Sequence, residues 1–242
     1  MRQGNALTRF IPLPRKVLRD LPFLKKIVWH EAFQNGLRYV ASFDSDPLVY
    51  LHVVITNPDG KQRDDPQTAF HSDTFHSTAK AWFFLYDIDD EEGPFTYVAG
   101  SHRLSKERLE WEREQSLAAS EHKNRLHARG SFRLSRSEFS RLNYPDPTRF
   151  AVPGNSLVVA DTHGFHARAS SGRPSVRVGI YGSLRKNPFL PWTGFDPFNL
   201  PGLRGTQARI HMAQKDLESR LRGKPGSHRY AGRILATDPP SY

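Results

Sequence analysis

The stretch TAFHSDTFHSTAKAWFFLYDI (residues 68–88) begins with polar residues and ends in an apolar run. Its second half has the composition of a buried β-strand. His71 and Asp73 lie in the polar half. In an extended chain, residues i and i+2 project from the same face, so these two side chains would converge on one point. The pair is therefore a candidate metal site, although a buried histidine hydrogen-bonded to an aspartate is the commoner arrangement.

Short strand-like runs and turns surround this stretch on both sides. Strands are predicted over residues 37–43, 48–56, 80–88, 95–100, 148–170 and 175–184. Helices are predicted over residues 17–36, interrupted by Pro22 and ended by Gly36, over the charged residues 103–127, and over residues 207–222. Many short strands with one helical excursion indicate a mostly β protein with flanking helices, either a double-sheet jelly roll or a sandwich.

A length of 242 residues is sufficient for one large core, so we predict a single domain. Its expected parts are a basic helical N-terminus (1–36), a barrel core (about 37–102 and 143–186), a helical insert (about 103–142) and an irregular basic C-terminal extension (187–242). The distribution of charged residues along the chain supports this division into parts. Residues 1–30 carry seven Lys or Arg and one acid, the insert carries ten and six, and residues 201–242 carry eight and three.

Composition excludes several classes of protein. The chain has no cysteine, so it has neither disulfides nor thiolate metal sites. It lacks an apolar run near the roughly 18–20 residues that a membrane helix needs, and its first residues lack a signal-peptide core. We therefore expect a cytoplasmic protein without membrane contact. The net charge of +10 is not accompanied by a zinc-finger, helix-turn-helix or aromatic RNA-binding pattern, so nucleic acid is not the expected partner.

A third metal ligand has to be found among eleven histidines. His163 and His166 follow an apolar run and precede the turn SSGRP, after which a second β-branched run begins. If that turn closes a β-hairpin, His166 lies opposite Arg177 on the same face of the sheet, and His163 faces Ile180 instead. A bulge at Gly164 would shift this register, so His163 is the alternative distal ligand.

Two histidines and one carboxylate on one face of an octahedral metal form the arrangement of non-haem Fe(II) oxygenases. A 2-oxoglutarate cosubstrate would fill two of the open positions with its 2-oxo acid end. Its other carboxylate would then need a cation, and an arginine pairs bidentately with a carboxylate and stays charged. The combination of His71, Asp73, His166 and Arg177 indicates such an oxygenase far more specifically than any one of these residues does.

Four motifs make the chain resemble the phytanoyl-CoA dioxygenase-like oxygenases. They are HSD (71–73), GPFTYVAGSHRLS (93–105), GFHAR (164–168) and RPSVRVGIYGS (173–183). Ala99 stands where this family usually has a proline. The resemblance implies a double-stranded β-helix, which is a cupin-like jelly roll, and a dependence on Fe(II), 2-oxoglutarate and O2.

The resemblance also implies roles for individual residues. The three iron ligands would be His71, Asp73 and His166. Arg177 would bind the far carboxylate of 2-oxoglutarate, and Lys80 on the following strand would assist. Because the carboxylate of Asp73 is present, we expect hydroxylation or another C–H oxidation rather than halogenation, with release of succinate and CO2.

The substrate class is the least defined expectation. We expect a small molecule, and eight arginines in the insert (103–142) favour an anionic group on it, because such an excursion can reach over the mouth of the barrel. The alternative is a solvated helix in which glutamates neutralise the arginines. Two other functions stay open: a catalytically silent jelly-roll ligand-binding protein and a basic nucleic-acid-binding protein. The sequence makes no prediction of the oligomeric state.

Overall fold

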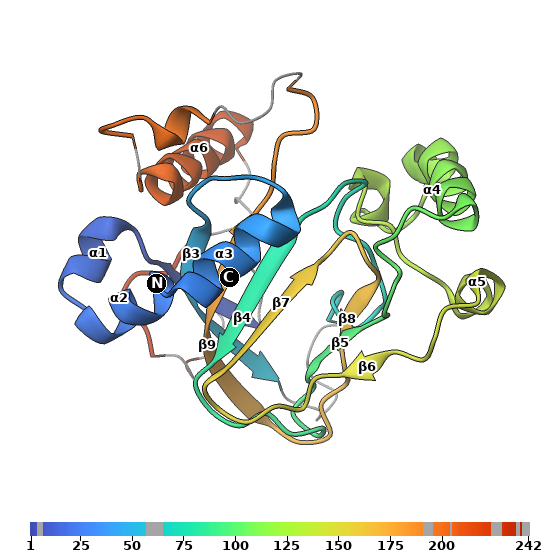
Figure 1. Ribbon diagram of the computed structural model, residues 1–242, viewed down its shortest axis with the longest axis horizontal. Coiled ribbons are helices and arrows are strands. Elements are labelled where there is room, and N and C mark those ends of the chain that lie inside the picture. Colours follow the sequence, from blue (N-terminus) through green and yellow to red (C-terminus); the bar gives the residue numbers. More distant parts are fainter. Residues whose placement is uncertain are drawn as a thin grey trace.

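Two antiparallel sheets with helices around them make up the structure, a computed structural model that describes residues 1–3, 7–56, 65–190, 196–203, 205–223, 229–235 and 238 (Figure 1). The helices are α1 (Arg15–Arg19), α2 (Pro22–Val28), α3 (Glu31–Ala41), α4 (Lys106–Ala118), α5 (Arg136–Leu142) and α6 (Gln207–Arg222), with short 3-10 turns at Ala119–Glu121, His127–Arg129 and Pro197–Asn199. None of the described helices combines the length and the apolar character of a membrane span.

The larger sheet has seven strands and the smaller has three. The larger has the order β10 (Arg229–Tyr230), β1 (Arg2–Gln3), β2 (Thr8–Pro12), β3 (Leu48–Thr56), β9 (Ser175–Leu184), β4 (Ala79–Phe84) and β7 (Ser156–Asp161). The smaller has the order β6 (Thr148–Arg149), β5 (Phe95–Tyr97) and β8 (His166–Arg168). The predicted class, mostly β with flanking helices in a double-stranded β-helix, is confirmed.

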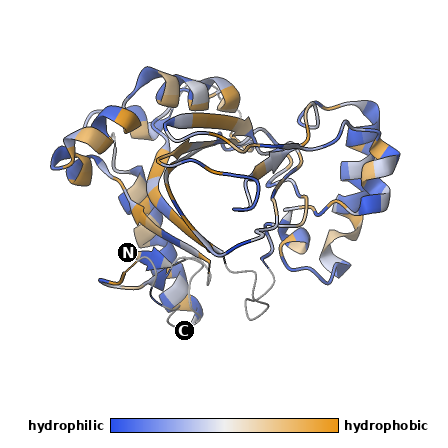
Figure 2. Cartoon of the chain, turned by 90° about the horizontal axis from the view of Figure 1, so that it is seen from below, coloured by the Kyte–Doolittle hydropathy of each residue, from blue (hydrophilic) through white to orange (hydrophobic). Residues whose placement is uncertain are grey.

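Helix α3 covers one face of the larger sheet, lying across β4 and β7 (Figure 1). Phe33, Leu37 and Ala41 are four residues apart, so they form one apolar stripe, and all three are buried in the core cluster with β3, β4 and β9. In Figure 2 the strands are coloured mainly as hydrophobic, whereas the helices at the right-hand edge are mainly hydrophilic. The main core therefore lies between α3 and the sheet.

The predicted helix over 17–36 and the predicted strand over 37–43 are both wrong in their limits. Helix α3 continues through Gly36 and occupies most of the predicted strand. A Cβ at Gly36 would lie 3.2 Å from Cγ2 of Val159, so the absence of a side chain lets the helix approach β7 closely. Gly36 thus allows α3 to pack closely against β7 and does not end the helix.

Both chain ends contribute strands, in addition to the helices α1, α2 and α3 near the N-terminus and α6 near the C-terminus. Strand β2 pairs with β3, and β1 pairs with both β2 and β10. Arg9 on β2 is fully buried, and its guanidinium donates to the carbonyl oxygens of Leu235, at 2.5 Å, and Asp238. The two ends of the chain are therefore joined at one edge of the larger sheet.

The predicted β-hairpin between His166 and Arg177 does not exist. Strand β8 belongs to the smaller sheet, where His166 pairs with Tyr97, and β9 belongs to the larger, where Arg177 pairs with Val54. The turn SSGRP carries the chain from one sheet to the other, as the double-sheet topology requires. The strands predicted within 148–170 are β6, β7 and β8.

The insert packs against the smaller sheet as a second core. Trp111 of α4 meets the ring of Phe165 edge-on, at 4.9 Å between centroids, and both are buried together with Val98 and Phe132. Helix α4 is shorter than the predicted 103–127. It begins after Ser105, whose side chain accepts a hydrogen bond from the backbone of Arg108. This core fixes the segment that immediately precedes His166.

Candidate metal site and adjoining pocket

His71, Asp73 and His166 converge at one point. One ligand atom from each side chain lies within 4.8 Å of the others, and no other cluster of this kind occurs in the described part of the chain. Nε2 of His71 is 4.0 Å from Oδ1 of Asp73, and Nε2 of His166 is 3.6 Å from its Oδ2. The same-face geometry predicted for the HSD motif thus brings the pair together with the distal histidine.

Backbone pairing between distant segments creates this convergence. His71 and His166 exchange two backbone hydrogen bonds of 3.0 Å, and the amide of Asp73 donates to the carbonyl oxygen of Thr162 at 2.9 Å. The HSD segment therefore runs beside the end of β7 and the start of β8. Backbone pairing with Thr162 and His166 therefore positions His71 and Asp73 next to His166.

Each imidazole is oriented by its other ring nitrogen. Nδ1 of His71 is 2.8 Å from the carbonyl oxygen of Ala69, and Nδ1 of His166 is 2.9 Å from that of Gly164. With Nδ1–H donating to a carbonyl, Nε2 keeps its lone pair for a metal. Nε2 of His71 is buried without a hydrogen-bond partner among the described residues. An unpaired buried nitrogen is unfavourable unless it has a ligand, so the site fits a bound cation.

The protonation states also fit a metal. Burial lowers the pKa of His71 to about 3 and that of His166 to about 4, so both rings are neutral near pH 7. Burial alone would raise the pKa of Asp73, but Lys80 and the two histidines hold it well below its usual range. Two neutral imidazoles and one carboxylate are the donor set that non-haem iron takes on one face.

Lys80 of β4 contacts this carboxylate directly. Its Nζ lies 2.5 Å from Oδ2 of Asp73, and it also hydrogen-bonds the side chain of Tyr181. Burial opposes the charge of Lys80, yet Asp73 raises its pKa above the usual range, so the ammonium is retained. Lys80, which the sequence predicts to assist the cosubstrate, therefore pairs with the candidate metal ligand Asp73.

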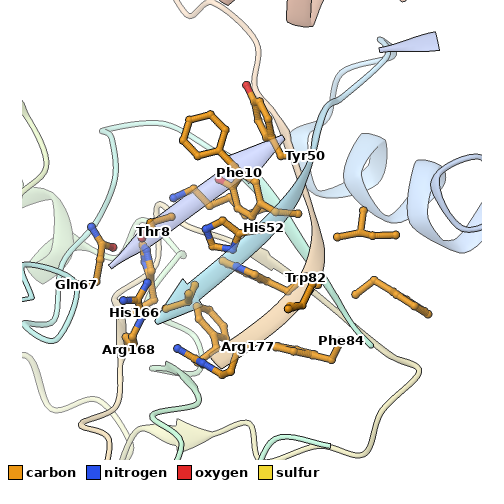
Figure 3. A pocket seen from close by; sticks show the side chains of 18 of the residues that line it. Thr8, Phe10, Tyr50, His52, Gln67, Trp82, Phe84, His166, Arg168 and Arg177 are labelled. Atoms are coloured by element: carbon orange, nitrogen blue, oxygen red, sulfur yellow. The ribbon is translucent and has the colours of Figure 1, made fainter. Parts of the chain in front are cut away.

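A pocket of about 530 Å³ adjoins the triad (Figure 3). Its walls are largely aromatic, with Phe10, Tyr50, Trp82, Phe84, Phe95 and Tyr181, and its cationic residues are Lys80, Arg168 and Arg177. His166 lines the same pocket, and Figure 3 shows it beside Arg168 and Arg177. His166 and Arg177 thus share one cavity although they lie in different sheets.

The two arginines differ in their partners. Nη1 of Arg168 is 2.6 Å from Oδ2 of Asp65, whereas Nε of Arg177 is buried with no hydrogen-bond partner among the described residues. Burial, and then the neighbouring Arg168, lower the pKa of Arg177 to about 10, so it is still charged near pH 7. A charged guanidinium whose buried Nε lacks a partner is suited to a carboxylate ligand.

His163, the alternative distal ligand, lies elsewhere. Its Nε2 is 2.6 Å from Oε1 of Glu112, and its carbonyl oxygen accepts a hydrogen bond of 2.9 Å from Arg108. Arg108 is fully buried, pairs with Glu112 at 2.9 Å and lies 3.9 Å above the ring of Phe165. The structure therefore joins His163 to the insert and does not bring it to His71 and Asp73.

The sequence did not predict two pairings near the site. Asp65 and Arg168 form their ion pair across 103 residues, and Arg133 of the insert pairs by backbone with His71. No local spacing links these positions. The spacing of Arg108 and Glu112, four residues apart, suggested a solvated pair, but both are buried.

Several solved structures are similar to this chain at low identity. The SnoK carbocyclase of nogalamycin biosynthesis, described as non-haem and α-ketoglutarate dependent, is 20% identical, with 73% of this chain and 63% of SnoK covered at a TM-score of 0.45. The chain thus spans less than two thirds of SnoK. The epimerase SnoN with Fe³⁺, α-ketoglutarate and nogalamycin RO is 17% identical, with 81% and 76% covered and a TM-score of 0.47. HygX from Streptomyces hygroscopicus with nickel and 2-oxoglutarate is 16% identical, with 82% and 77% covered and a TM-score of 0.44.

No curated protein matches the sequence. The profile of the phytanoyl-CoA dioxygenase family (PhyH) matches residues 13–134, which are 122 of the 242 residues. The match contains His71, Asp73 and Lys80 and ends before His166 and Arg177. It confirms the resemblance inferred from the motifs. Since the profile covers half of the sequence, the chain belongs to the phytanoyl-CoA dioxygenase family of iron- and 2-oxoglutarate-dependent oxygenases.

Proposed function

We propose that the protein is a dioxygenase that hydroxylates, or otherwise oxidises, a C–H bond of a small molecule. The observation that carries this proposal is the convergence of two neutral imidazoles and a carboxylate, His71, His166 and Asp73, beside a pocket that contains the unsatisfied Arg177. Bound Fe(II) and 2-oxoglutarate supply the oxidising chemistry, with O2 consumed and succinate and CO2 released.

The residues of the chain have distinct roles in this proposal. His71, Asp73 and His166 hold the metal, and Arg177 pairs with the far carboxylate of 2-oxoglutarate. The aromatic walls exclude water and orient the substrate. A silent binding protein would not need a buried, unpaired Nε2 on His71, because such a nitrogen destabilises the fold. That alternative is therefore not favoured.

The nucleic-acid alternative gains no support from the placement of two basic residues. Arg9 is buried and donates to backbone carbonyls, and Arg108 is buried in an ion pair with Glu112. Charge that is enclosed in this way does not face phosphates, so part of the net charge of +10 is structural.

The variant Arg177→Gln tests the proposed function, and the measured quantity is the affinity for 2-oxoglutarate. Removing a charged partner of a carboxylate should weaken 2-oxoglutarate binding about ten- to a hundred-fold, equivalent to ~1.5–3 kcal/mol, and leave Fe(II) affinity intact. Anaerobic titration calorimetry measures both affinities. Arg173→Gln is the matched control, because Arg173 is exposed and pairs with Asp89 and Glu92. Equal 2-oxoglutarate affinity in Arg177→Gln would remove this residue from the site, and a wild-type protein that binds no 2-oxoglutarate would sink the dioxygenase proposal.

Lys80→Met separates two roles of Lys80. We propose that Lys80 holds the carboxylate of Asp73, because its Nζ is 2.5 Å from Oδ2. The variant leaves a partly buried carboxylate without its cation, so the metal-free protein should lose ~1–3 kcal/mol of unfolding free energy. Added metal then replaces the missing charge, and the rise of the melting temperature on adding Ni(II) should exceed that of the wild type.

Differential scanning fluorimetry with and without Ni(II) provides the measurement, and Lys80→Arg is the charge-retaining control. If the rise on adding Ni(II) equals that of the wild type, Lys80 does not act on Asp73. If 2-oxoglutarate affinity falls as far as in Arg177→Gln, Lys80 binds the cosubstrate directly, as the sequence predicted.

A further inference from the structure

Arg133 is the arginine of the insert that lies against the candidate metal site. It forms an antiparallel bridge with His71, and the flanking backbone bonds join Leu134 to Phe70 at 2.8 Å and Ser72 to Phe132 at 3.0 Å. The segment around Arg133 therefore runs beside the HSD motif as an additional short strand. This pairing places Arg133 directly opposite a proposed iron ligand.

The guanidinium of Arg133 is only partly satisfied. Nη1 donates to Oγ of Ser131 at 2.8 Å, and that hydroxyl in turn donates to the carbonyl oxygen of Ser72 at 3.0 Å. Nη2 is buried and has no hydrogen-bond partner among the described residues, and no described carboxylate forms an ion pair with it. A buried donor without a partner costs about 1–3 kcal/mol, which an anionic ligand would offset.

The charges around the site leave Arg133 without a counterion. Lys80 is offset by Asp73, and Arg168 is offset by Asp65. In the loaded protein, the proposed partner of Arg177 is the far carboxylate of 2-oxoglutarate. Arg133 then remains without a carboxylate partner, so the loaded site keeps a positive charge beside His71.

We propose that Arg133 binds an anionic group of the substrate, a carboxylate or a phosphate, next to the metal. This inference rests on the proposed function and specifies its substrate class. Leu126 of the same insert lines the pocket, whose other walls are largely aromatic. The insert thus contributes one apolar contact to the pocket and places one cation beside His71, which suit a substrate with an apolar or aromatic body and a single anionic group.

The test uses three probes that share a ring and differ in charge: phenyl phosphate, benzoate and benzyl alcohol. Each is titrated calorimetrically into full-length protein loaded with Ni(II) and saturating 2-oxoglutarate, so that turnover does not occur and the cosubstrate site is filled. The wild type should bind at least one anionic probe about tenfold or more tightly than benzyl alcohol. Tighter binding of phenyl phosphate than of benzoate assigns a phosphate, and the reverse order assigns a carboxylate.

Arg133→Gln should abolish the preference for the anion and leave benzyl alcohol binding unchanged. Arg133→Lys should retain part of the phosphate preference, because an ammonium keeps the charge but loses the bidentate fork. The matched control is Arg129→Gln, an exposed arginine of the same insert, which should behave as the wild type.

Loading with Ni(II) and 2-oxoglutarate is measured first for every variant. A wild-type protein that does not load contradicts the proposed function itself. A protein that loads normally but shows no anion preference, or an Arg133→Gln variant that keeps the preference, overturns the role of Arg133 alone.

Discussion

Replacing His71, Asp73 or His166 with alanine is expected to abolish both tight Fe(II) binding and the formation of succinate from 2-oxoglutarate. Each substitution removes one of the three donor atoms that lie within 4.8 Å of one another. Loss of a residue that merely supports a metal ligand already costs about 10–100-fold in metal affinity, so loss of a ligand should cost more than ~100-fold. Calorimetric titration with Fe(II) under anaerobic conditions measures the affinity, and succinate is quantified after exposure to oxygen.

His163→Ala is the informative comparison for these variants. His163 is buried and bonded to Glu112, so its loss should lower stability and leave the triad able to bind Fe(II). The assignment of the distal ligand is contradicted if His166→Ala still binds Fe(II) tightly and His163→Ala does not.

The second large effect is expected from Glu112→Ala. Arg108 is 0% exposed, so removing Glu112 leaves a buried guanidinium without its counterion and takes the partner of His163 away as well. Breaking a buried ion pair from one side destabilises a protein by about 3–5 kcal/mol. For a chain of this length we expect a fall in the melting temperature on the order of 10 °C.

Glu114→Ala is the matched control for Glu112→Ala. Glu114 lies on the same helix and pairs with Arg141, but both of these side chains are about half exposed. Exposed pairs contribute about 0–1 kcal/mol, so this variant should unfold close to the wild type in urea. Equal urea midpoints for the two variants would show that the buried network adds nothing to stability. In a double variant, Arg108→Leu with Glu112→Leu, part of the loss should be recovered, because no uncompensated charge remains.

Where apolar periodicity was long and bounded by turns, the sequence predicted elements to the residue. Strands β3 and β9 have the predicted limits of 48–56 and 175–184, and helix α6 lies where a helical stretch near 207–222 was predicted. The error at 37–43 arose because seven residues of mixed apolar and β-branched type are compatible with either a helix or a strand. Packing of Leu37 and Ala41 against the larger sheet decides for the helix.

The candidate site was predictable where it depends on local spacing and not where it depends on pairing between distant segments. The two-residue separation of His71 and Asp73 brings their side chains together in an extended chain, as inferred. The predicted hairpin placed His166 and Arg177 side by side for a reason that the structure contradicts, since each belongs to a different sheet. They meet because the two sheets enclose one pocket. Arg133 reaches His71 through a bridge across more than sixty residues, which no sequence period encodes.

The pairing of β1 with β10 affects the order in which the chain can fold. Arg2 faces Tyr230 in this pair, so nearly the whole chain separates the two partners. During synthesis, β1 and β2 emerge long before β10, so the edge of β1 that β10 covers has no partner until residue 230 has left the ribosome. Contacts that close so long a loop form late, because the entropy of the intervening chain opposes them. Until then the edge remains an open template for pairing with other chains, and closure by the C-terminal strand ends that exposure.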